Sequence, residues 1–178
     1  MTKITFRGTV ASGIGRYATL SIPGRSRLDG APPDWPEALY PGSLNIRVSA
    51  YPSDSEGHAL INRVEELDQG RFAPTFEIPR QSISNNQLGP RPGLPRGGDA
   101  QVWRAELLIE SDGRVICCWV LRRFGSTVGE QLELVADRRL RDEGLPDGCR
   151  VGVVLEGTWL NGGETGLRRE WSRSAAEQ

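Results

Sequence analysis

The feature that most constrains the fold is a pair of apolar runs separated by a tight turn. Residues 101–110 and 114–123 are rich in Val, Ile, Leu and Trp, and Ser111-Asp112-Gly113 lies between them. An Asp-Gly turn between two such runs is a strong signal for a β-hairpin. The second run is apolar enough to be covered on both faces, so Cys117 and Cys118 are expected in the core. The chain is therefore expected to build a sheet around this hairpin.

Further strand candidates recur along the chain, and turn residues separate them. The sequence holds 22 glycines and 12 prolines, which favours short strands and turns over long helices. The other expected strands are residues 4–12, 17–22, 43–49, 72–78, 131–136 and 150–160. Helical spacing of apolar residues predicts a helix over 59–69 with Gly70 just after its end, and 137–143 can form a helical turn. This pattern predicts a mainly β fold, as a closed or nearly closed barrel with one or two short helices.

The length predicts one barrel domain. The chain has 178 residues, and we expect the domain to span 1–160 with an extended segment at about 52–99 and a polar tail at 161–178. Trp35 and Leu39 are expected to pin the irregular stretch 23–39 to the core. Residues 85–99, rich in Gly and Pro, are expected to form a mobile surface loop or lid carrying Arg91 and Arg96.

Charge and cysteine content argue against several classes of protein. The net charge of −1 gives no electrostatic case for binding nucleic acid or an anionic membrane. No stretch reaches the length of a membrane-spanning helix. Three cysteines without framework spacing argue against a secreted disulfide scaffold, so a cytoplasmic location is expected. His58, the only histidine, is expected to be a surface or capping residue.

A candidate metal site lies at the start of the strand over 43–49. The pair Pro41-Gly42 predicts a turn before it. Alternation along the strand places Leu44, Ile46 and Val48 on one face and the Ser43 hydroxyl and Asn45 carboxamide on the other. Two neutral oxygens at the mouth of a strand can hold Mg²⁺, although the same residues can also cap the turn or face solvent.

A candidate anion site lies near the N-terminus, in Ser12-Gly13-Ile14-Gly15-Arg16. Two glycines around one residue let successive backbone N–H groups point to one side, and such a nest binds anions, with Arg16 adding further donors. The alternative is a plain hairpin tip between the expected strands 4–12 and 17–22.

Three segments together resemble the CTP-dependent riboflavin kinases. They are Gly8-Thr9-Val10-Ala11-Ser12-Gly13-Ile14-Gly15-Arg16-Tyr17, then Tyr40-Pro41-Gly42-Ser43-Leu44-Asn45, then Leu132-Glu133-Leu134-Val135-Ala136 followed by Leu140-Arg141 and Leu145-Pro146-Asp147-Gly148. The family reads roughly G-x-V-x-S-G-x-G-E-G-x-Y, P-Y-x-G-T-L-N, L-E-I-I-A-P-x-x-L-R and L-x-D-G-D. The resemblance implies a six-stranded cradle-loop barrel that transfers the γ-phosphoryl group of CTP to riboflavin, giving FMN.

The resemblance also implies roles for individual residues. Ser43 and Asn45 would hold Mg²⁺, and Glu133 would contact the flavin and orient the acceptor hydroxyl or accept its proton. Ser126 or Thr127 would make a second flavin contact. The nucleotide would be bound by Gly13, Ile14, Gly15, Arg16, Arg138, Arg139, Leu140 and Arg141. Read without the resemblance, Glu133 is a carboxylate on the wet face of a strand, and the arginines form a solvated helical turn.

The sequence departs from the family in ways that leave alternatives open. The glycine loop lacks the family's Glu-Gly pair, since Gly15 is followed directly by Arg16 and Tyr17. Asp137 replaces a proline, which places a carboxylate near the expected phosphates. A non-catalytic nucleotide- or flavin-binding regulatory module on the same barrel is therefore the main alternative. A protein-interaction barrel is a weaker one.

Overall fold

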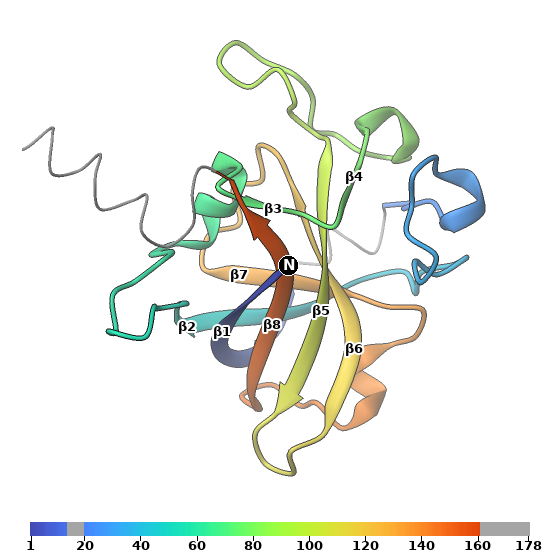
Figure 1. Ribbon diagram of the computed structural model, residues 1–178. Coiled ribbons are helices and arrows are strands. Elements are labelled where there is room, and N and C mark those ends of the chain that lie inside the picture. The colour runs from blue at the N-terminus through green and yellow to red at the C-terminus, as the bar shows by residue number, and fades with distance from the viewer. Residues whose placement is uncertain (14–19, 161–178) are drawn as a thin grey trace, which may run out of the picture.

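The fold is a closed barrel, seen in a computed structural model that describes residues 1–13 and 20–160 (Figure 1). Within those ranges, six antiparallel strands form the barrel in the order β1-β2-β7-β6-β5-β8, and β8 pairs with β5 to close it. The barrel strands are β1 (Thr2–Ala11), β2 (Leu44–Ala50), β5 (Ala100–Ile109), β6 (Val115–Arg123), β7 (Gln131–Val135) and β8 (Arg150–Trp159). The mainly β, six-stranded barrel expected from the sequence is confirmed.

Two short strands and four short helices complete the described structure. Strand β3 (Phe72–Ala73) pairs with β8, and β4 (Phe76–Ile78) pairs with β5. The helices are all of the 3₁₀ type: η2 (Arg25–Arg27), η3 (Val64–Gln69), η4 (Arg80–Ser82) and η5 (Leu140–Glu143). Among the described residues, no helix combines the length and the apolar character needed to cross a membrane.

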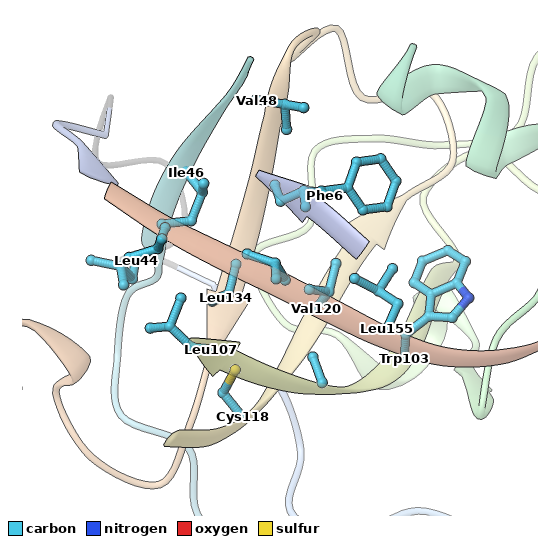
Figure 2. Packing of buried hydrophobic residues seen from close by; sticks show 14 of the residues in the cluster. Phe6, Leu44, Ile46, Val48, Trp103, Leu107, Cys118, Val120, Leu134 and Leu155 are labelled. Atoms are coloured by element: carbon cyan, nitrogen blue, oxygen red, sulfur yellow. The ribbon is translucent and has the colours of Figure 1, made fainter. Parts of the chain in front are cut away.

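Strand alternation fills the barrel interior with apolar side chains. On β2, Leu44, Ile46 and Val48 are buried in the main core, while Arg47 and Ser49 are exposed, as the sequence pattern predicts. Figure 2 shows how the inward side chains of the strands meet; the labelled ones are Phe6, Leu44, Ile46, Val48, Trp103, Leu107, Cys118, Val120, Leu134 and Leu155. This apolar filling makes the barrel interior a packed core.

A second apolar cluster covers part of the outer surface of the barrel. Trp35 is 1% exposed and lies against the rings of Trp119 and Phe76, with centroids 5.1 and 4.9 Å away. Leu39 packs at the edge of the same cluster. Both residues therefore pin the stretch 23–39 to the protein, as expected, but onto the outer face of the sheet rather than into the barrel.

The predicted helix at 59–69 is wrong for its first half. Only Val64–Gln69 is helical, and Gly70 ends it in the left-handed conformation with φ 70°. Leu60 and Ile61 are buried without belonging to a helix. Ile61 joins the main core from an irregular loop, so buried side chains on a loop resemble helical periodicity here over a few residues.

The predicted hairpin between residues 4–12 and 17–22 does not form in the described part of the chain. Strand β1 pairs with β2 on one edge and β8 on the other, so it has no free edge for residues 20–22. Ser21 instead makes a single bridge to Ser84. Barrel closure thus overrides a local hairpin signal.

The position of Cys117 differs from the prediction that both Cys117 and Cys118 lie in the core. Cys118 is buried and faces the interior, but Cys117 is exposed on the outside of β6. The apolar cluster covers this outer face at Trp119 and Leu121 and ends before Cys117. Burial raises the pKa of the Cys118 thiol to about 12.

The loop at 85–99 is anchored at its base. Asn86 Nδ2 donates a hydrogen bond to the Gly98 carbonyl at 2.7 Å, and Arg96 donates to Glu77 at 2.6 Å. The yellow-green segment that projects at the top of Figure 1 is this loop. It is an extension from the barrel end next to β4 and β5.

A buried ion pair fastens η3 to the barrel. Arg122, with a side chain only 5% exposed, donates from Nε and Nη2 to the two Asp68 oxygens at 2.7 and 3.0 Å. A third donation, from Nη1 to the Val128 carbonyl at 3.1 Å, satisfies the guanidinium further. Burial raises the pKa of Asp68, and Arg122 opposes that rise.

Asp68→Ala is expected to lower the free energy of unfolding by roughly 3 kcal/mol, because it leaves the Arg122 charge buried without its partner. Asp142→Ala is the matched control: its partner Arg139 lies 3.6 Å away and both side chains are more than half exposed. The control substitution should lower the free energy of unfolding by less than about 1 kcal/mol. Urea denaturation of both variants measures this, and equal losses would contradict the structural role given to Asp68.

Candidate functional site

The candidate site is a cavity of about 220 Å³ at the end of β7. The turn before β2 and the segment that follows β7 meet there, so two of the three resembling segments share one space. The lining residues are Tyr40, Pro41, Gly42, Ser43, Leu44, Leu134, Ala136, Arg138, Arg139, Leu140 and Arg141. We call this the arginine cavity.

The charge of the arginine cavity is one-sided. Three guanidinium groups, those of Arg138, Arg139 and Arg141, line it, and none of its lining residues within 1–13 and 20–160 is acidic. Arg139 is more than half exposed, and its 3.6 Å contact with Asp142 is a loose ion pair. Guanidinium groups bind phosphate and carboxylate oxygens through paired N–H donors. The cavity is therefore suited to an anion with several oxygens.

Local structure orients the segment Arg138–Arg141. Helix η5 begins after Arg139, and Gly144 ends it with φ 80°. Arg138 is held by Glu143 at 2.8 Å and by Asp137 at 3.1 Å. Because these carboxylates lie outside the lining of the arginine cavity, they position the guanidinium without filling the space with negative charge.

Arg141 belongs to a hydrogen-bonded cluster that joins this segment to the end of β1. It donates to the Ala11 carbonyl at 2.9 Å and pairs with Asp147 at 2.7 Å. Ser12 donates from its hydroxyl to the other Asp147 oxygen at 2.5 Å. The hydrogen bond from Ser12, reinforced by Arg141, holds the pKa of the Asp147 carboxyl below its ordinary value. In the sequence, Asp147 stands out only as part of a turn motif. Its contacts with Ser12 and Arg141 depend on the pairing of β1 with the start of β8, which the sequence alone does not reveal.

Gly13 lies directly against Asn45. A Cβ atom at Gly13 would collide with the Asn45 amide nitrogen, so any larger residue there would require the Asn45 side chain to shift. The structure thus brings the start of the glycine loop to the predicted metal ligand. Ile14, Gly15 and Arg16, the rest of the predicted nucleotide loop, lie outside the described residues.

Asn45 and Glu133 are neighbours across two strands. They are direct partners in the pairing of β2 with β7, and their side chains are 7% and 9% exposed. Since Leu44 and Leu134 beside them point inward, both polar side chains point to the outer face. Directly opposed residues have Cβ atoms about 5 Å apart, so an amide and a carboxylate meet here. Both residues are buried on this outer face. Glu133 is therefore not the solvent-exposed carboxylate that the residues alone suggested, and Asn45 does not face solvent, which was one alternative for it.

The predicted metal ligands therefore occupy different surroundings. Ser43 is half-buried and lines the arginine cavity, whereas Asn45 is the next outward residue and is covered by Gly13. Ser43, Asn45 and Glu133 supply neutral and anionic oxygens, which is the donor set that Mg²⁺ takes from proteins.

The second predicted flavin contact lies elsewhere. Ser126 and Thr127 are in the connection between β6 and β7, while the arginine cavity lies where β7 ends. The Ser126 hydroxyl accepts the Val128 N–H at 3.3 Å, and Thr127 is exposed. Among the described residues that line the arginine cavity, neither of these two occurs.

A group of possible ligands at another loop has a structural explanation. Ligand atoms of Asp54, Glu56 and His58 lie within 4.8 Å of one another. Asp54 Oδ1 accepts the backbone N–H groups of Glu56 and His58 at 2.9 and 2.8 Å, and these bonds lower the pKa of Asp54. This is the hydrogen bonding of a turn capped by an Asp side chain. His58 is exposed, as the sequence led us to expect.

The sequence matches no protein-family model and no curated protein. The resemblance to the CTP-dependent riboflavin kinases therefore depends on the quoted motifs.

The arginine cavity is expected to bind inorganic tripolyphosphate, and Arg139→Ala should weaken that binding about tenfold or more. A hydrogen bond to a charged group contributes about 1.5–3 kcal/mol, which corresponds to this factor. Titration calorimetry at fixed salt measures the affinity. Arg91→Ala, which removes an exposed arginine outside the lining of the cavity, is the matched control. Equal affinities of the two variants would contradict the assignment.

Proposed function

We propose that this protein is a Mg²⁺-dependent phosphotransferase that transfers the terminal phosphoryl group of a nucleoside triphosphate, with CTP the expected donor, to riboflavin, giving FMN. The observation that carries the proposal is the arginine cavity. Its lining combines the Tyr40–Ser43 turn with Arg138–Arg141, the segments to which the motif resemblance assigns metal and nucleotide binding. A triphosphate has the charge and the oxygen atoms that three guanidinium groups favour.

The proposed reaction needs positioning and charge neutralisation more than covalent help from the protein. Arg138 and Arg139 bind phosphate oxygens, and Arg141 holds the end of β1 beside them. Ser43 lines the same space, and its hydroxyl would serve as a ligand of Mg²⁺, with Asn45 as the second ligand. A bound Mg²⁺ would supply neutralisation of the phosphate charge. Glu133 lies opposite Asn45, and the motif resemblance assigns it a contact with the flavin.

The second candidate function is a regulatory module that binds a nucleotide or a flavin without turnover. Two observations favour it: the glycine loop is shorter than the family pattern, and Ser126 and Thr127 lie at the other end of the β6–β7 hairpin from the arginine cavity. This alternative predicts saturable binding of CTP or riboflavin and no FMN.

The test of catalysis is mass-spectrometric detection of FMN from riboflavin, each of the four common nucleoside triphosphates, and Mg²⁺. We expect product with CTP, loss of product when Mg²⁺ is chelated, and a fall in kcat of at least tenfold in Ser43→Ala and Asn45→Ala, because each removes a metal ligand.

Two variants serve as controls. Ser43→Thr keeps the hydroxyl and should retain turnover. Ser49→Ala removes an exposed hydroxyl from the same strand, outside the lining of the cavity, and should match the unmodified protein. Saturable binding of CTP or riboflavin, with no FMN formed from any donor, would reject the kinase proposal in favour of the regulatory module.

A further inference from the structure

A second cavity, of about 350 Å³, adjoins the arginine cavity on the outside of the barrel. It lies over the outer faces of β5, β6 and β8, beside the segment that carries Trp35. Its polar lining consists of Asp34, Arg104, Glu106, Cys117, Asp137, Arg138 and Glu156. Ala136 and Arg138 line both cavities, so the two spaces meet at the end of β7. We call the second one the acidic cavity.

The acidic cavity has the opposite charge to its neighbour. Asp34, Glu106, Asp137 and Glu156 outnumber Arg104 and Arg138 in its lining. Carboxylates accept hydrogen bonds and repel anions, so this space disfavours a phosphate and favours a ligand with several N–H or O–H donors.

Ion pairs hold the carboxylates in place. Arg104 donates to both oxygens of Asp34 at 2.6 and 2.7 Å and lies over the Trp119 ring, 5.3 Å from its centroid. The hydrogen bonds from Arg104 lower the pKa of Asp34. Lys3 reaches Glu106 at 3.2 Å and Glu156 at 3.4 Å, which shows that these two carboxylates together accept a hydrogen-bond donor.

Transfer of a phosphoryl group requires the acceptor oxygen to lie next to the phosphorus, at about 3–3.5 Å before reaction. An acceptor at Ser126 and Thr127 would be separated from the arginine cavity by the length of β7. An acceptor in the acidic cavity would meet a phosphate of the arginine cavity at Arg138, which both linings share.

We propose that the acidic cavity binds the phosphoryl acceptor through a chain of hydroxyl groups, such as the ribityl chain of riboflavin, and that Asp137 accepts the proton of the reacting hydroxyl. This inference rests on the proposed kinase function. The acceptor oxygen forms a bond to the γ-phosphorus, the bond from that phosphorus to the bridging oxygen of the nucleoside diphosphate breaks, and the hydroxyl proton passes to an Asp137 oxygen. Arg138, 3.1 Å from Asp137, neutralises charge on the transferred group.

Cys117 provides a direct readout of occupancy. It is exposed and lines the acidic cavity; Cys118 also lines it but is buried, and Cys149 lines neither cavity. In the unmodified protein, saturating riboflavin or ribitol is expected to slow alkylation of Cys117 by N-ethylmaleimide at least fivefold and to leave Cys149 unchanged. CTP alone should leave both rates unchanged. Tandem mass spectrometry separates the three sites.

A matched pair of variants tests the carboxylates. Glu106→Gln should raise the riboflavin concentration needed for protection at least severalfold. Glu110 lies four residues further along the same outward-facing row and pairs with Arg7 at 3.0 Å outside the cavity, so Glu110→Gln should behave like the unmodified protein. Absence of Cys117 protection by both riboflavin and ribitol, with or without CTP and Mg²⁺, would overturn the proposal.

The protection assay separates this proposal from the kinase proposal. Protection of Cys117 without FMN formation would support the cavity as a polyol site and reject catalysis. FMN formation without protection would support the kinase and reject the acidic cavity as its acceptor site.

Kinetics test the role of Asp137. Asp137→Asn should lower kcat about 100-fold with little change in KM for riboflavin, since proton transfer is lost while the hydroxyl contacts remain. Asp29→Asn, an exposed carboxylate outside both cavities, is the control. An unchanged kcat in Asp137→Asn would overturn the role of the carboxylate.

Discussion

The pairing of β5 with β8 is the constraint on which the rest of the structure depends. It joins Arg104 to Glu156 at one end of the register and Ile109 to Val151 at the other, and it removes the free edges that an open six-stranded sheet would expose. Closure fixes which side chains point inward, and it also aligns Arg104, Glu106 and Glu156 on one outer patch. The acidic cavity therefore follows from the same hydrogen bonds that close the barrel. The second apolar cluster then completes the wall of this cavity by placing Asp34 beside Arg104.

Local patterns predicted most of the fold, and long-range pairings account for what they missed. The alternation at 44–48 and the Asp-Gly turn after Ile109 are properties of short segments, so both were readable from sequence. The second partner of β1 is β8, more than 140 residues away, and no local signal reveals it. For this reason the expected hairpin does not form at residues 20–22, the described part of the expected second strand. The helix expected from Leu60 and Ile61 failed for a related reason, because both side chains are buried from a loop and Ile61 joins the main core.

The candidate site, too, was predictable from the sequence only in part. The motif resemblance connected Ser43 with Arg138–Arg141, and the structure places them around one cavity. Residue-level reasoning alone gave Glu133 as a solvated carboxylate; the pairing with Asn45 and the burial of both could not be read from either strand separately. Asp34 and Glu156 lie far apart in the sequence, and each reads as an ordinary surface residue until the strands are arranged in space, whereas Asp137 was already expected near the phosphates.

The antiparallel contact between Thr2 and Gly157 also has a consequence for biosynthesis. Strand β1 leaves the ribosome first among the barrel strands, yet β8 must be synthesised before it can take its final neighbour. Until then, the growing polypeptide carries an open sheet whose apolar face and strand edges are accessible to other chains. Pairings this distant along the polypeptide also slow folding, because a long loop must close before they form. Folding of this barrel is therefore completed only after translation has passed Trp159, and the nascent chain is the form most exposed to aggregation.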